Sequence, residues 1–155
     1  MIKRVHHIGI AVNNLAESTA VFEKLLGMKA EVHAAPCQKV TEAVFKIGDE
    51  VEIDLLEPLG QDSTVAKFLE KRGEGLHHIA MEVEDVNAGL KEMEQKGFQL
   101  IDKEGRPGVA GQIGFLHPKS VNGVLVELIE PKEKKNRKPT PNGQFFNKFI
   151  SKEKK

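Results

Sequence analysis

The chain has 155 residues, and its 23 basic residues balance its 23 acidic ones, so the formal net charge is zero. A neutral chain without Trp or Tyr lacks the basic surface and the stacking side chains typical of nucleic-acid binders. No stretch approaches the roughly 20 consecutive apolar residues of a membrane span. The single Cys37 cannot form a disulfide within the chain and no signal peptide is visible, so we expect a cytoplasmic protein.

The first predicted element is a strand over residues 3–12, because apolar residues alternate along it. Its branched apolar side chains share the face that we expect a helix to cover, and His7 lies on the opposite face. His6 has the other parity, so we expect it to be structural or solvent-facing. Four more elements complete this unit: a helix over residues 15–26 and strands over residues 28–33, 38–47 and 50–57.

A connector over residues 59–74 contains a short predicted helix, residues 63–71. A second unit then begins with a strand on which His78 again lies opposite the branched apolar residues. The charged tail over residues 132–155 includes a segment, residues 142–150, with the spacing of an amphipathic helix. The remaining predicted elements are a helix between Asp85 and Gly97, strands over residues 98–101, 112–116 and 124–130, and a glycine-rich loop over residues 106–111.

The two units repeat one pattern. The sequence His-His-Ile occurs at residues 6–8 and again at residues 77–79, and residues 51–58 match residues 124–131 position by position. Because an internal duplication determines the architecture, we predict an α+β fold of two tandem β-α-β-β-β modules. Their strands would form one cupped, mixed or antiparallel sheet with helices on the outside. The predicted modules are residues 1–58 and residues 75–131.

Alternation places four donor side chains on the face opposite the apolar residues of their strands: His7, Asp54, His78 and Glu127. A single strand histidine is usually structural, but two imidazoles and two carboxylates at matched positions are hard to explain by solvation alone. This donor set suits a divalent ion such as Mn²⁺, Co²⁺, Ni²⁺ or Zn²⁺. Four protein ligands on a six-coordinate ion would leave two adjacent positions open, which is typical of a catalytic site.

Several motifs resemble those of the vicinal oxygen chelate superfamily, and within it the methylmalonyl-CoA epimerase family. The resemblance extends over about residues 2–131, and the connector and turn motifs are its most specific parts. The motifs are His-Ile-Gly-Ile-Ala-Val (7–12), Asp-Ser-Thr-Val-Ala-Lys-Phe-Leu (62–69), Gly-Leu-His-His-Ile-Ala (75–80), Phe-Leu-His-Pro-Lys-Ser (115–120) and Gly-Val-Leu-Val-Glu-Leu (123–128).

The resemblance implies one divalent ion in the cupped sheet, held at the same four positions that alternation identifies. Asp54 departs in detail, because relatives have either an amide or a carboxylate there. The implied reaction exchanges the proton on the carbon between the carboxylate and the thioester of methylmalonyl-CoA, through an enolate that the ion stabilises as a Lewis acid. The expected partners are therefore an acyl-CoA substrate and, in a homodimer, a second copy of the chain.

The proton transfers need a base on one side of the substrate and an acid on the other. The resemblance places the base at Glu42, which shares its strand face with Val40 and Val44 and should point into the cup. The second acid or base is either Glu127 or a bound water. Candidate substrate-binding residues are Gln38, Lys119 and Ser120, with Arg106 either contacting substrate or ending an ordinary turn.

Three other functions fit the same fold. A glyoxalase I-like lyase would use the same metal and proton transfer on a glutathione hemithioacetal. An extradiol dioxygenase would need two histidines and one carboxylate around Fe(II), and Asp54 as a fourth ligand argues against it. A metal-free binding protein is disfavoured because all four ligand positions carry donor side chains.

Overall fold

The computed structural model describes residues 1–132, so the charged linker after residue 132 and the expected helix over residues 142–150 lie outside the described part. The elements are β1 (Arg4–Ala11), α1 (Leu15–Leu26), β2 (Glu31–Ala35), the 3₁₀ turn η1 (Pro36–Gln38), β3 (Val40–Ile47), β4 (Val51–Pro58), α2 (Thr64–Arg72), β5 (Gly75–Glu82), α3 (Val86–Gln95), β6 (Arg106–Pro107), β7 (Gly111–Leu116), the 3₁₀ turn η2 (Pro118–Ser120) and β8 (Val126–Pro131).

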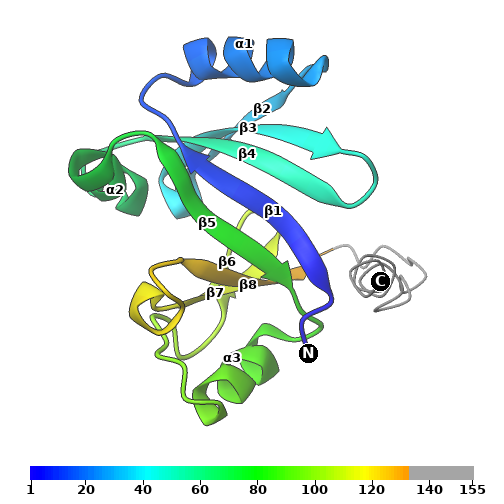
Figure 1. The fold of residues 1–155 in the computed structure, drawn as a ribbon, viewed down its shortest axis with the longest axis vertical. Helices are drawn as coiled ribbons and strands as arrows, with labels where there is room; N and C mark the ends of the chain where they lie inside the picture. The colour runs from blue at the N-terminus through cyan, green and yellow to red at the C-terminus, as the bar shows by residue number, and fades with distance from the viewer. Residues whose placement is uncertain (133–155) are drawn as a thin grey trace, which may run out of the picture.

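All eight strands belong to one mixed sheet, in the order β2-β3-β4-β1-β5-β8-β7-β6. β1 and β5 run antiparallel at its centre, and each is flanked on its other side by a parallel strand, β4 or β8 (Figure 1). The order β-α-β-β-β occurs twice, and the two copies are related by a pseudo-twofold axis between β1 and β5. The predicted α+β fold of duplicated modules is confirmed.

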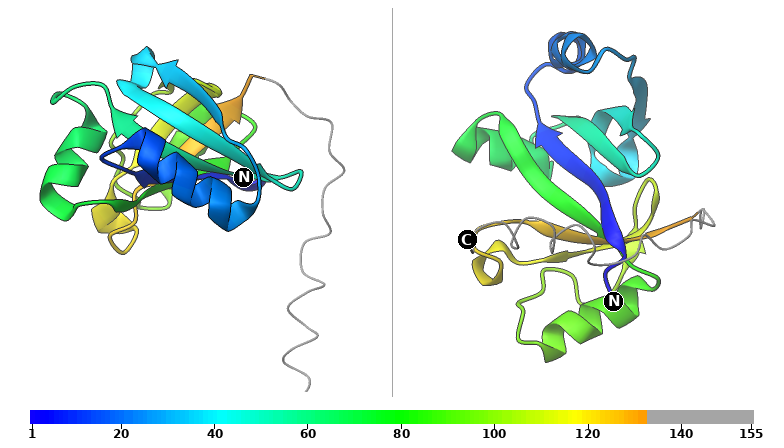
Figure 2. Two further views of the ribbon diagram at one scale, coloured as in Figure 1. Left: turned by 90° about the horizontal axis from the view of Figure 1, so that it is seen from above. Right: turned by 45° about the vertical axis from the view of Figure 1, so that its right-hand side comes forward.

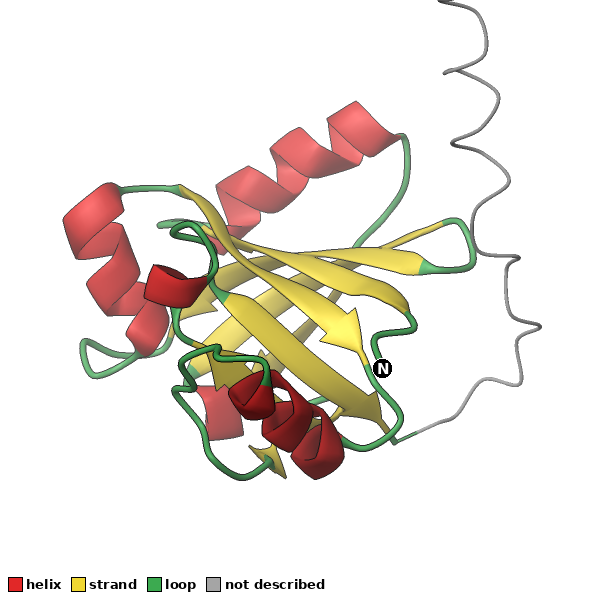
Figure 3. Cartoon of the chain, turned by 60° about the horizontal axis from the view of Figure 1, so that its bottom comes forward, coloured by secondary structure: helices red, strands yellow, loops and turns green. Residues whose placement is uncertain are grey.

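The two arms of the curled sheet carry α1 and α3 on their outer sides. These helices lie at opposite ends of the molecule (Figure 2), and the helices lie on the outside of the sheet (Figure 3). α1 packs on one face of the first arm, where Val12, Phe45 and Leu55 are buried. α3 packs its Leu90 against buried Leu128 on the second arm. The branched residues of each strand therefore point outward to a helix, as their alternation predicts.

The connector helix α2 closes one end of the cup. Ser63 caps it by accepting a hydrogen bond from the Val65 amide, and Gly73 ends it with a positive φ of 73°. Val65 packs with Ala11 and Leu56, which belong to the inner face of the sheet. None of the helices in residues 1–132 is long and apolar enough to cross a bilayer.

The predicted strand over residues 98–101 is wrong. Leu100 makes only an isolated bridge to Leu116, and the short strand of this module is β6, inside the segment that we expected to be a glycine-rich loop. Phe98 and Leu100 pack against the cluster under α3, so their apolar character reflects side-chain burial rather than strand pairing. Apolar runs this short do not distinguish the two.

Candidate active site

The register of the sheet assembles the site around two small residues. Gly9 on β1 and Ala80 on β5 occupy equivalent positions, and each pairs on one side with a histidine and on the other with a carboxylate. The paired residues are His78 and Asp54 for Gly9, and His7 and Glu127 for Ala80. A Cβ on Gly9 would lie only 2.3 Å from Cε1 of His78, so glycine makes room for that ring.

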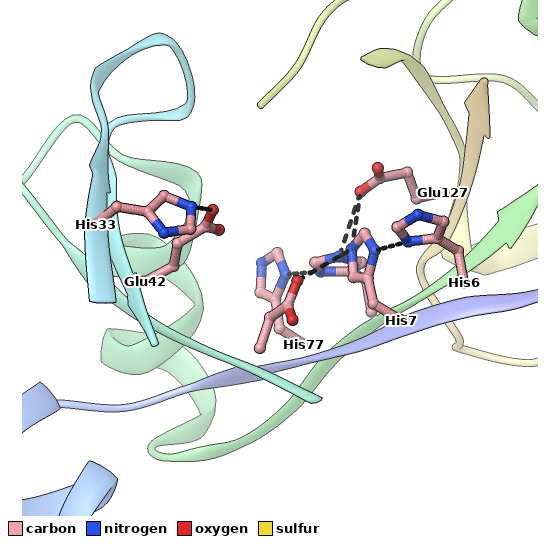
Figure 4. A network of polar contacts seen from close by, with 8 residues as sticks. His6, His7, His33, Glu42, His77 and Glu127 are labelled. Atoms are coloured by element: carbon pink, nitrogen blue, oxygen red, sulfur yellow. Dashed lines mark hydrogen bonds and ion pairs between the residues drawn. The ribbon is translucent and has the colours of Figure 1, made fainter. Parts of the chain in front are cut away.

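The four predicted ligand residues are all buried and converge inside the cup. Nε2 of His7 lies 3.0 Å from Nε2 of His78, and the latter lies 3.2 Å from Oε2 of Glu127 (Figure 4). Nε2 of His7 lies 3.9 Å from Oε2 of Glu127 and 3.9 Å from Oδ2 of Asp54. Among the described residues, His7, His78 and Glu127 form a cluster that can hold a metal ion, with donor atoms within 4.8 Å of one another.

Burial controls the protonation of these groups. It raises the pKa of the Asp54 and Glu127 carboxyls to about 8, and neighbouring carboxylates such as Glu42 add to the rise. It lowers the pKa of the His7 imidazole to about 3 and that of His78 well below its usual value. Both imidazoles are therefore neutral at pH 7, the form in which histidine binds metals.

These residues fit a divalent cation. Oδ1 of Asp54 is buried and has no hydrogen-bond partner among residues 1–132, so it is free to accept a cation. A cation favours ionised carboxylates and neutral imidazoles, because those forms offer lone pairs. Two neutral imidazoles and two carboxylates suit borderline ions from Mn²⁺ to Zn²⁺.

Two further histidines lie beside the cluster. Nδ1 of His6 is 2.9 Å from Nδ1 of His7, and Nδ1 of His77 is 2.9 Å from Nδ1 of His78. Of the two roles expected for His6, the solvent-facing one is wrong, because the residue is buried and lines the cavity; a structural role agrees with its burial. A bulge in each central strand reverses the simple alternation there. The repeated His-His-Ile sequence was the signal that could have identified both residues.

The cup encloses a cavity of about 410 Å³. Glu42 lines it from β3, and its Oε1 lies 2.6 Å from Nε2 of His33 on β2 (Figure 4). Burial raises the pKa of the Glu42 carboxyl, and His33 opposes that rise. Gln38 and Arg106 also line the cavity. The alternation that pointed Glu42 into the cup thus agrees with its position.

The turn after β7 holds the other two expected substrate-binding residues, Lys119 and Ser120, and neither lines the cavity. The hydroxyl of Ser120 accepts a hydrogen bond from the Gln99 amide and donates one to the His117 carbonyl. The sequence of this turn therefore supports local structure, and a substrate contact for these two residues stays a prediction.

Comparison with known proteins places this architecture in a family. Residues 6–117 match the model of the glyoxalase/bleomycin resistance protein/dioxygenase superfamily. The chain belongs to this superfamily. The resemblance to the vicinal oxygen chelate fold is therefore confirmed.

Three members of the superfamily are especially similar. The uncharacterized Bacillus subtilis protein YqjC is 43% identical, over 84% of this chain and 94% of that protein. The ethylmalonyl-CoA/methylmalonyl-CoA epimerase of Cereibacter sphaeroides is 41% identical, over 83% of this chain and 98% of the enzyme. A solved methylmalonyl-CoA epimerase in complex with methylmalonyl-CoA and NH₄⁺ is 38% identical, with a TM-score of 0.78 over 83% of this chain and 94% of its own.

Proposed function

We propose that this chain is a metal-dependent epimerase that interconverts the 2R and 2S forms of methylmalonyl-CoA. The observation that carries the proposal is the similarity, over almost the whole length of the relative, to an epimerase solved with methylmalonyl-CoA. The buried cluster of two histidines and a glutamate supports it, because a divalent ion held there would act as a Lewis acid on a thioester carbonyl and so favour removal of the adjacent proton.

His7, His78 and Glu127 would hold the ion, and Asp54 would join them as a fourth ligand through the oxygen that lacks a protein partner. A bound divalent cation supplies Lewis-acid stabilisation of the negative charge that develops on the thioester oxygen. Mn²⁺, Co²⁺, Ni²⁺ and Zn²⁺ all suit these ligands. The walls of the cup keep the reacting carbon in one orientation, which favours transfer on a defined face.

Glu42 is the proposed base. It reaches into the cavity from β3, apart from the histidine cluster, so substrate between the two would present its proton to this carboxylate (Figure 4). Burial raises its pKa, which brings the strength of the base closer to neutrality. Glu127, or a water, would serve on the opposite face.

The remaining substrate contacts follow from position. Gln38 and Arg106 line the cavity and are the candidates for polar contacts to the malonyl part. The guanidinium of Arg106 lies 5.4 Å from the centre of the Phe115 ring and forms an ion pair with Asp102 at 3.3 Å, so its head is held at the cavity wall. We retain Lys119 and Ser120 only as candidates for the outer part of the coenzyme A.

The test is proton NMR of methylmalonyl-CoA with the metal-loaded protein in deuterated water. We expect loss of the α-proton signal, together with conversion of one pure epimer into the other. A glyoxalase I-like lyase would instead turn over a glutathione hemithioacetal and leave the α-proton of the CoA ester in place. Unchanged methylmalonyl-CoA in the presence of each of the four metals would contradict the proposal.

A further inference from the structure

Two equivalent bulges interrupt the central pair of strands. On β1, Val5 pairs with Met81 and His7 pairs with Ala80, so His6 is an extra residue without a counterpart on β5. A bulge puts two consecutive residues opposite one residue of the partner strand and bends the backbone locally. His6 can therefore point into the cup beside His7 although the two are neighbours in sequence.

The second bulge repeats the first on the opposite strand. Gly9 pairs with His78 and Ile10 pairs with Leu76, so His77 is the extra residue on β5. Exchange of the two strands by the pseudo-twofold axis converts one set of pairs into the other. The duplicated chain thus contains the same bulge twice, and in each copy the extra residue is a histidine directly before the ligand histidine.

Both extra histidines make the same contact. Each lies with its Nδ1 at 2.9 Å from the Nδ1 of the following histidine, and both line the cavity. The ligand histidines turn their other nitrogens, the Nε2 atoms, toward each other at 3.0 Å and toward Glu127. The ring of His77 also meets the Phe68 ring of α2 edge-on, with centroids 5.0 Å apart, which restrains its orientation.

The chemistry of imidazole assigns the proton in each pair. A neutral imidazole carries one N–H, and a nitrogen that binds a cation must present a bare lone pair. A ligand histidine that binds through Nε2 therefore carries its proton on Nδ1, and that proton needs an acceptor. The only arrangement that satisfies both nitrogens of a pair has the extra histidine protonated on Nε2, with its Nδ1 accepting.

We propose that His6 and His77 are positioning residues that accept hydrogen bonds from Nδ1–H of His7 and His78 and thereby hold both in the metal-binding tautomer. The proposal rests on the proposed metal-dependent function. Beyond that function, each ligand histidine requires the histidine directly before it in the sequence. The bulge places the hydrogen-bond acceptor and the metal ligand side by side. A carboxylate or a carbonyl commonly fills this role next to zinc, and here a second imidazole does.

The direct test is histidine ¹⁵N NMR on the wild-type protein loaded with Zn²⁺, which is diamagnetic. Two-bond ¹H–¹⁵N correlations report which ring nitrogen carries each proton. We expect His7 and His78 to be protonated on Nδ1, and His6 and His77 to be protonated on Nε2 with a bare Nδ1. A proton on Nδ1 of His6 or His77 in the zinc-loaded protein would overturn the assignment. Failure to bind zinc would remove the metal-dependent function, and the positioning roles with it.

Variants test the consequence for affinity. His6→Leu and His77→Leu remove the acceptor, whereas His6→Asn and His77→Asn keep an oxygen near the position of Nδ1. By calorimetric titration with Zn²⁺ we expect the leucine variants to bind about 10–100-fold more weakly and the asparagine variants to recover most of the loss. His117→Leu, outside the cavity, is the matched control and should bind as the wild type does.

Thermal unfolding without metal separates positioning from packing. Leucine and asparagine variants that are equally stable, but differ in zinc affinity, support the proposal. Equal loss of affinity in both kinds of variant, or no loss in the leucine variants, would overturn it. If a leucine variant does not fold, the tautomers measured in the wild type still decide the question.

Discussion

Nε2 of His33 lies 2.6 Å from Oε1 of Glu42, and the two residues face each other directly in the ladder between β2 and β3. The side chain of His33 is 42% exposed, whereas that of Glu42 is only 8% exposed. The imidazole therefore connects a buried carboxylate in the cavity to the solvent at the edge of the sheet. A proton taken up by Glu42 has a path to water through this contact.

Replacement of the proposed base should separate metal binding from proton transfer. Glu42→Gln keeps the shape of the side chain but cannot accept a proton, so we expect α-proton exchange in deuterated water to slow by about 10²–10⁴-fold. Metal content should be unchanged, because Glu42 is not in the ligand cluster. Proton NMR and elemental analysis of the same sample measure both quantities.

Glu52→Gln is the matched control for that experiment. Glu52 also lines the cavity, from β4, but it makes no contact with His33 among the described residues. Glu52 acts on Glu42 as a nearby charge that raises its pKa, so we expect the exchange rate of Glu52→Gln to stay close to that of the wild type at a pH above that raised pKa, where Glu42 is ionised in both proteins. An unchanged rate in Glu42→Gln would exclude Glu42 as the base, and an equal decrease in both variants would indicate a general effect of cavity charge.

The rate of epimerisation should depend on pH through the ionisation of the Glu42 carboxyl. Burial raises its pKa, and the base must be ionised, so the rate should fall as the pH decreases through this raised pKa. His33 lowers the same pKa through its charge and its hydrogen bond. His33→Gln should therefore move the acidic limb of the kcat profile to higher pH. A limb that stays in place, or moves to lower pH, would contradict the pairing.

The need for a small residue beside the histidine cluster gives a prediction at Gly9. A Cβ there would lie 2.3 Å from Cε1 and 2.5 Å from Nδ1 of His78, so Gly9→Ala must displace that ring. We expect the affinity for Zn²⁺ to fall by at least about tenfold. Gly60→Ala is the control, because its nearest atom is the end of the exposed Asp62 side chain at 3.1 Å. Wild-type affinity in Gly9→Ala would show that the ring can move without cost.

Removal of the cation should lower both activity and stability. A ligand that binds only the folded state, present at 100 times its Kd, stabilises that state by about 2.7 kcal/mol. Treatment with a chelator should therefore lower Tm and abolish exchange, and added Co²⁺ or Mn²⁺ should restore both. His78→Ala should show no rise in Tm with metal and no activity. Full activity after complete removal of metal would refute a metal-dependent mechanism.

The duplicated pattern allowed the sequence to predict most of the fold. Two copies of one strand motif determined that the modules form a single sheet, and alternation on each strand separated the helix-covered face from the inner face. Because parity depends only on local backbone geometry, it located His7, Asp54, His78 and Glu127 on the inner face without any knowledge of contacts. The same reasoning pointed Glu42 into the cup.

Contacts between distant segments do not follow from local patterns in the chain. The pairing of His33 with Glu42 depends on the register between β2 and β3, which no local pattern specifies. The turn that carries Lys119 and Ser120 has basic and hydroxyl groups suited to a phosphate, yet the structure holds it outside the cavity wall. Only the folded arrangement of strands decides which polar residues reach the site.

The sequence by itself determined that histidines and carboxylates recur at matched positions, because duplication and a period of two are properties of the chain alone. The tertiary structure decided that His6 and His77 join them. A bulge adds one residue to one strand and reverses the parity beyond it, and it exists only where two strands pair with unequal spacing. The two His-His pairs are evident in the sequence. The face of the sheet to which His6 and His77 point depends on the pairing between β1 and β5.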